Sequence, residues 1–257
     1  MEQIVTPSKM ESFRRNLPAS LLKIKEANLA ASNERLLLNG FPNSRIEDWK
    51  YSRLNRIASL NLQPKNSAPI GWEQYSLTTD AYTFVFQNDQ CIYFSQDLPD
   101  GMMVKEAVDL SIEEWKSFEN NSHVIDLNNS HAQNGLCLWL RKGVHLTQPV
   151  QLIFLSTGTE QAAIHRNQIV LEKESKMELI VSHFSIDGKK NYKNIVSEFH
   201  LEENAFLSVH KLQNEEGEDF HFSTENIHQK NNSNFTLLKK DKKYLVLFFC
   251  IIAYALL

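Results

Sequence analysis

The chain has 257 residues, enough for one large domain or two ordinary ones with a hydrophobic core. Its 27 Lys and Arg against 31 Asp and Glu give a formal net charge of −4, so there is no basic footprint for nucleic acid. The hydrophobic content of 42%, with few Gly and Pro, also excludes a wholly disordered or collagen-like chain.

The cysteines and the N-terminus both bear on the cellular compartment. Cys91, Cys137 and Cys250 are odd in number and far apart, which predicts neither a disulfide framework nor a Cys-x-x-Cys pair. Residues 1–16 contain no apolar stretch of the kind found in secretory signal peptides. We therefore expect a cytoplasmic protein.

The N-terminal part of the chain has the pattern of helices. Ser8 and Glu11 fit a capping box, in which the two side chains satisfy free amide groups at a helix start, and Ser44 with Glu47 fits a second one. We therefore predict a helical region over 1–60. Residues 61–122 are expected to form a linker and a small α/β region, with strands over 82–86 and 91–94 and a short helix over 111–119.

Short β-type runs recur from residue 136 onward. They cover 136–140, 150–155, 168–171, 177–184, 195–201, 206–212 and 220–223, with polar turns between them. Similar turn segments place Ser175, Asn204 and Ser233 at equal intervals along the chain. A fixed period of turn and strand is typical of a β-solenoid, so we predict an incomplete solenoid core over 123–238. A β-sandwich has similar strand spacing and is the alternative fold.

Residues 239–257 do not continue this pattern. A Lys-rich start is followed by a run over 244–257 without charged or amide side chains, which is shorter than the ~20 residues that cross a bilayer. We expect an apolar tail that is not part of the repeat, produced by a truncated or out-of-frame end. The other interpretation is a weak membrane anchor with basic residues before it, but we expect no membrane partner.

Sequence motifs for common chemistries are absent. The chain has no P-loop, no dinucleotide-binding GxGxxG, no GxSxG and no HExxH. The acidic run Glu215, Glu216, Glu218 and Asp219 is interpreted as a solvated loop around a glycine.

Histidine is the one residue type with a suggestive distribution. All nine fall between residues 123 and 228, at positions 123, 131, 145, 165, 183, 200, 210, 221 and 228. Stacked coils bring distant strands together, so His183, His200 and His210 are candidates to meet around a metal ion. However, the chain lacks a His-x-His pair, and imidazole is also common on solvated sheet faces. We therefore predict no catalytic residue and no metal ligand, and we leave cofactor-binding residues unassigned.

Residues 40–52, with the sequence GFPNSRIEDWKYS, carry a family resemblance. They resemble the segment G-x-P-x-x-R-x-E-x-W-K-Y-T of the SufD branch of the SufB/SufD family, with Ser52 where the family usually has Thr. Trp49 is interpreted as a family marker that anchors helical packing. The resemblance covers roughly residues 10–237 and continues in order at 127–128, 134–135, 143–144, 149–152, 156–158, 166–167 and 210–213.

The resemblance implies a helical N-terminal region followed by a right-handed parallel β-helix. It implies a non-catalytic scaffold subunit of the SUF iron–sulfur cluster assembly complex, which pairs with SufB and the SufC ATPase. An iron–sulfur cluster and reduced flavin are implied only for the full complex. The family β-helix continues beyond the point equivalent to Leu237, so the resemblance also implies C-terminal truncation and largely missing contact regions. The alternatives are a metal-dependent or sugar-active solenoid enzyme, or a non-functional fragment with a membrane-seeking tail.

Overall fold

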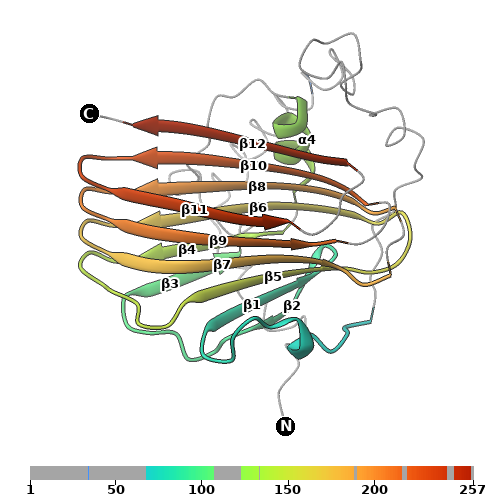
Figure 1. Ribbon diagram of the computed structural model, residues 1–257, viewed down its shortest axis with the longest axis horizontal. Coiled ribbons are helices and arrows are strands. Elements are labelled where there is room, and N and C mark those ends of the chain that lie inside the picture. The colour runs from blue at the N-terminus through green and yellow to red at the C-terminus, as the bar shows by residue number, and fades with distance from the viewer. Residues whose placement is uncertain are drawn as a thin grey trace, which may run out of the picture.

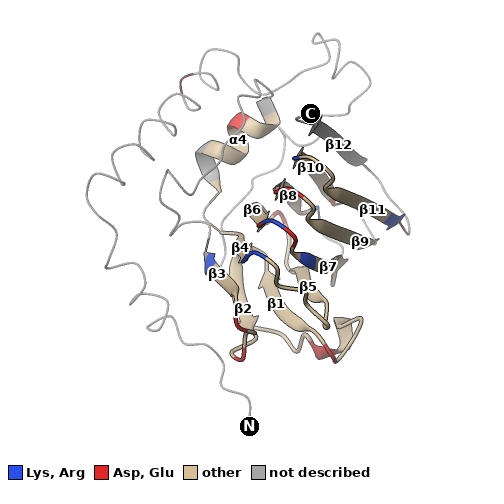
Figure 2. Ribbon diagram, turned by 90° about the vertical axis from the view of Figure 1, so that its left-hand side faces the viewer, with Lys and Arg blue, Asp and Glu red and all other residues tan. Residues whose placement is uncertain are grey.

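The computed structural model describes residues 34, 68–106, 123–132, 134–187, 190–215, 219–241 and 246–255. Within these ranges two six-stranded sheets face each other, as Figures 1 and 2 show. Their strand orders are β11-β9-β7-β5-β1-β2 and β12-β10-β8-β6-β4-β3, so consecutive strands from β4 onward alternate between the sheets. From β4 to β10, each strand pairs in parallel with the strand that comes two places later in the chain. The predicted β-solenoid is therefore confirmed.

The strand boundaries agree well with the apolar runs in the sequence. The first elements are the 3-10 helix η2 (Glu73–Tyr75) and the strands β1 (Tyr82–Gln87), β2 (Gln90–Phe94) and β3 (Met102–Glu106). The solenoid strands are β4 (Leu136–Leu140), β5 (Val150–Ser156), β6 (Ala162–Leu171), β7 (Lys176–Ser185), β8 (Tyr192–Leu201), β9 (Phe206–Asn214), β10 (Phe220–Gln229), β11 (Asn234–Asp241) and β12 (Val246–Ala255).

Antiparallel strands cover one end of the parallel stack. β2 pairs antiparallel with β1, and β3 pairs antiparallel with β4, so each sheet ends in a reversed strand. Reversed strands at this end interrupt the parallel pairing by which a further coil would stack on the solenoid. Trp72 and Tyr75 from the preceding segment pack against Val85 and Ile153, on the far side of the sheet from the core. Segment 68–106 is therefore packed onto the solenoid.

The coils are not uniform in length. Strand register makes Lys176, Phe206 and Asn234 equivalent, so the coil that begins at Lys176 is longer than the coil that begins at Phe206. The equal intervals between the turn residues would instead make Lys176 equivalent to Ala205, and that expectation is wrong by one position. The spacing of similar residue types along the sequence gives only the mean coil length, because one coil is longer and the next is shorter.

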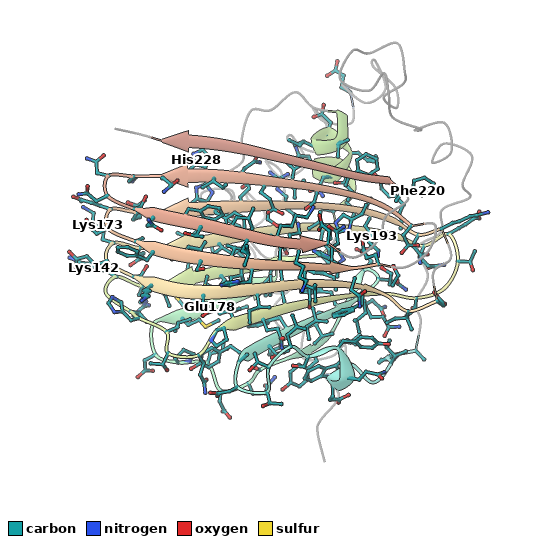
Figure 3. The ribbon with its side chains drawn as sticks, viewed as in Figure 1. Lys142, Lys173, Glu178, Lys193, Phe220 and His228 are labelled. Carbon is teal, nitrogen blue, oxygen red and sulfur yellow. The ribbon has the colours of Figure 1, made fainter. Side chains whose placement is uncertain are left out.

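The turns after β6, β8 and β10 share one backbone conformation. Glu174, Asn204 and Asn232 have φ values of 60°, 58° and 55°, in the left-handed region that asparagine tolerates better than most residues. Exposed charged side chains run along this edge, where Lys173 lies 2.8 Å from Glu203 (Figure 3). Such solvated pairs contribute little to stability, so backbone hydrogen bonds and the core hold the coils together.

One helix was not anticipated from the sequence. α4 (His123–His131) lies beside the sheet that contains β6 and β8 (Figure 2). The side-chain amide of Asn128 donates to the backbone oxygens of His165 at 2.9 Å and Asn194 at 3.0 Å. These contacts come from strands far away in the sequence, and the helix itself has a polar sequence with little amphipathic pattern, so local reasoning missed it.

The C-terminal range contains a strand. β12 pairs in parallel with β10 over its whole length, and β11 already reaches Asp241. The sheets thus extend into 239–257. The origin of that segment, and the boundaries predicted for the regions of the chain, stay predictions. The helical region over 1–60, apart from Glu34, and the helix over 111–119 lie outside the described residues. Among the described residues no helix has the length and apolar character needed to span a membrane.

Candidate functional site: the polar interior of the solenoid

The space between the sheets is apolar at one end and polar at the other. Side chains alternate along a strand, so every second residue of β7 and β9 points inward. On β9 these residues are first Leu207 and Val209, and then Lys211 and Gln213. The register places His183 of β7 beside Gln213, so neighbouring strands change from apolar to polar at the same level.

The opposite sheet reverses this order. β10 begins with inward-facing His221, Ser223 and Glu225 and continues with the core residue Ile227. Strands of the two sheets run in opposite directions (Figure 1), so the polar halves face each other. The polar residues here are all buried, namely His183, Lys193, Lys211, Gln213, Glu215, Asp219, His221, Ser223 and Glu225.

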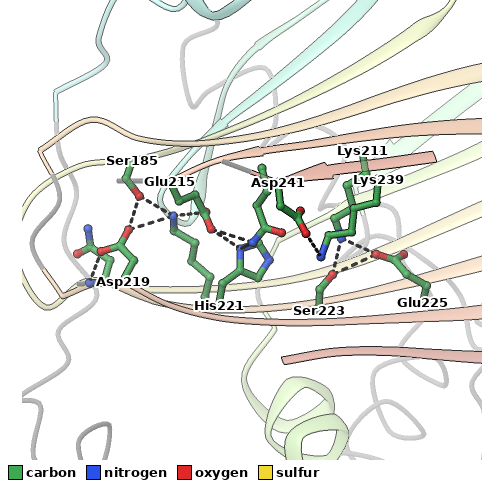
Figure 4. A network of polar contacts seen from close by, with 12 residues as sticks. Ser185, Lys211, Glu215, Asp219, His221, Ser223, Glu225, Lys239 and Asp241 are labelled. Atoms are coloured by element: carbon green, nitrogen blue, oxygen red, sulfur yellow. Dashed lines mark hydrogen bonds and ion pairs between the residues drawn. The ribbon is translucent and has the colours of Figure 1, made fainter. Parts of the chain in front are cut away.

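Two buried lysines, Lys193 and Lys211, organise the charged groups. Figure 4 labels Lys211 and the carboxylates of this network. Lys193 forms ion pairs with Glu215 and with Asp219, whose oxygen lies 3.1 Å away, and donates to Ser185. Lys211 lies 2.5 Å from the carboxylate of Glu225. Each of these two lysines therefore has a charged partner, as the desolvation of a buried charge requires.

Two histidines complete the cluster beside Glu215. His221 Nδ1 lies 2.8 Å from Glu215 Oε2, and the rings of His183 and His221 are 4.7 Å apart in an edge-to-face arrangement. The His183 ring also stacks on Phe154 at 4.9 Å. The imidazole of His183 thus packs against two rings.

Burial sets the ionisation of this cluster. It lowers the pKa of both His183 and His221, which therefore stay neutral at neutral pH. Burial alone would raise the pKa of Glu215, but the positive charge of Lys193 and the hydrogen bond with His221 outweigh it and hold that pKa well below its ordinary value. The cluster thus presents neutral imidazoles next to an ionised carboxylate.

Several buried nitrogen atoms have no hydrogen-bond partner. Among the described residues these include both ring nitrogens of His183 and Nε2 of His221. His183, Lys211 and Glu225 also line a small cavity between the sheets, together with apolar residues from the core. Bare nitrogen lone pairs in a polar interior can coordinate a cation or accept a hydrogen bond.

The three histidines considered from the sequence do not meet. Only His183 points into the solenoid. His210 lies on the other face of β9, with its side chain 43% exposed and 3.4 Å from Glu178. His200 lies on the outer face of β8, where it stacks on His228 at 5.0 Å. The structure instead brings His183 together with Glu215 and His221.

The interpretation of the acidic run as a solvated loop is wrong for two of its residues. Glu215 and Asp219 are buried in the ion-pair network, and each is only 7% exposed. Residues 216–218 lie outside the described part of the chain. The period-two pattern of β9 carries the signal that was missed, since it runs from Lys211 through Gln213 to Glu215.

The fold and this interior define a β-solenoid protein with a buried, ion-paired polar half. Residues 154–241 match the family described as "SUF system FeS cluster assembly, SufBD core domain". A relative from Synechocystis sp., described as an iron–sulfur cluster assembly SufBD family protein, is 22% identical over 225 residues, covering 77% of this chain and 49% of the relative. Both comparisons support the SufB/SufD family. The chain spans about half the length of this curated relative.

Proposed function

We propose that this chain is a SufD-like, non-catalytic scaffold subunit in SUF iron–sulfur cluster assembly. It pairs with SufB and with the SufC ATPase in the cytoplasm, and the cluster and reduced flavin belong to the full complex. The observation that carries the proposal is the position of the family match. Residues 154–241 run from within β5 to the end of β11, the range in which the structure forms regular parallel coils.

Two further observations support the finer parts of the proposal. The segment over 40–52 resembles the SufD branch, which favours SufD over SufB. The charged groups of the interior are paired with one another and buried. Such an interior suits a scaffold whose contacts are made by its surfaces and edges.

Co-purification tests the proposal directly. The chain is co-expressed with SufB and affinity-tagged SufC from its own organism, and the eluate is analysed by size-exclusion chromatography with light scattering. We expect all three chains in one peak. The control is a tagged bait unrelated to SUF, which must not retain the chain. Soluble SufB and SufC that leave the chain behind under the same conditions would overturn the proposal.

A cellular experiment tests the scaffold role itself. The chain is expressed in a strain that lacks its own SufD and depends on the SUF system, and the activity of an iron–sulfur enzyme is measured. We expect restored activity. Failure to restore it, although the chain is present and bound to SufB, would contradict the scaffold role but not the pairing.

A further inference from the structure

Several histidine nitrogens of the interior are buried without a hydrogen-bond partner among the described residues. His183 is 0% exposed, and neither of its ring nitrogens has a hydrogen-bond partner among the described residues. A buried polar atom without a partner has lost its hydrogen bonds to water and gained none in return. His221 adds a further bare nitrogen, Nε2, in the same place. The protein atoms of the described residues alone therefore leave this site unsatisfied.

We propose that His183, Glu215 and His221 form a binding site for a divalent metal ion of the zinc type inside the solenoid. One ligand atom from each residue lies within 4.8 Å of the other two. The three residues come from β7, from the position just after β9 and from β10, so two sheets contribute to the site. This inference goes beyond the proposed function and does not depend on it.

The ligand chemistry agrees with an ion of this class. Two imidazoles and a carboxylate are a common set for Zn²⁺ and for other first-row divalent ions, with bonds of about 2.0–2.2 Å. Such bonds place tetrahedral ligands roughly 3.4 Å apart, so the three side chains, whose ligand atoms lie within 4.8 Å of one another, shift to reach that spacing when an ion binds. The Gln213 amide lies 2.9 Å from Glu215 Oε2 and 2.8 Å from His221 Nδ1, and it holds these ligands in position.

The charge of the surroundings also favours a cation. Two lysines, Lys193 and Lys211, form ion pairs with three carboxylates, those of Glu215, Asp219 and Glu225. While the histidines are neutral, these five side chains together carry one excess negative charge. An added divalent ion is repelled by Lys211, which keeps Glu225 as its partner, and by Lys193. That lysine keeps Asp219 as a partner at 3.1 Å when Glu215 turns to the metal.

Metal titration of the full chain tests the proposal. Protein stripped with a chelator is titrated with Zn²⁺ by calorimetry and with Co²⁺ by visible absorption. We expect one ion per chain. His183→Gln and His221→Gln should each weaken binding at least tenfold. The matched control is His210→Gln, which removes a partly exposed histidine on the other face of β9 and should leave binding unchanged.

The Co²⁺ spectrum of the unaltered chain keeps the test decisive if the interior variants fail to fold. Nitrogen and oxygen ligands produce d–d bands without a thiolate-to-metal charge-transfer band. We expect that spectrum, and a charge-transfer band would assign the ion to a cysteine and overturn the proposal. Folded chain that binds neither ion, or folded His183→Gln and His221→Gln proteins that bind as tightly as the unaltered chain, would overturn it as well.

Discussion

The buried histidine of β6 offers a sharp test of the interior. His165 is 1% exposed, and its Nε2 donates to the backbone oxygen of Asn88 at 2.7 Å. The other nitrogen, Nδ1, has no partner among the described residues, and the rings of Phe86 and Phe154 lie 5.3 and 5.1 Å away. Protonation would add a buried N–H without an acceptor. Burial accordingly lowers the pKa of His165 to about 4.

The sign and size of the effect follow from linkage. In the unfolded chain a histidine titrates near pH 6.5. Below that pH the unfolded state therefore binds a proton that His165 does not bind in the native state. The preference of His165 for its neutral form therefore stabilises the fold fully above pH 6.5, and this contribution is lost as the pH falls toward about 4. Between pH 7 and pH 5 the loss from this residue is about 2 kcal/mol.

Urea unfolding at pH 7 and pH 5 measures this loss. The unaltered chain is compared with His165→Gln, in which the glutamine amide can still donate to Asn88 but cannot titrate. The control is His145→Gln, at an exposed histidine. From pH 7 to pH 5 the unaltered chain should lose about 2 kcal/mol more unfolding free energy than His165→Gln does. The other titrating groups are common to both proteins and cancel in the comparison.

Two outcomes would refute this reasoning. One is an equal loss of stability in the unaltered chain and in His165→Gln. The other is a His165 ring that titrates near pH 6.5 in the folded protein, measured by NMR. Either result would mean that the imidazole reaches water or finds an acceptor for its second N–H.

Three more predictions concern buried charge and close packing, each measured by denaturant unfolding. Glu225→Ala should cost about 3–5 kcal/mol because it removes the carboxylate partner of buried Lys211, whereas replacing both residues by methionine should cost clearly less. Gly135→Ala should destabilise by more than about 1 kcal/mol, since its φ is +147° and a Cβ would lie 1.8 Å from the backbone oxygen of Arg166; an unchanged midpoint would contradict this close approach. Burial raises the pKa of Asp89 to about 7, so its ionised form disfavours folding and Asp89→Asn should stabilise the chain more at pH 8 than at pH 5; an equal effect at both would mean that Asp89 is solvated.

Local sequence patterns were enough to predict most strands and the class of fold. Apolar runs such as 136–140 and 150–155 correspond closely to β4 and β5, because a buried strand must present apolar side chains wherever it meets the core. The repeated turn signals also predicted a solenoid, since equivalent turns occur once in each coil. These features depend on neighbours in the chain, and neighbours are visible in a sequence.

Only the tertiary structure decided which distant residues meet. His183 was singled out from the sequence, but its partners are Glu215 and His221 rather than His200 and His210. A register shift of one residue moves a strand side chain from the interior to the outer surface. Coils of unequal length also change which positions are equivalent between strands. The site therefore depends on register and coil length, which are determined by packing between sheets and not by any local pattern.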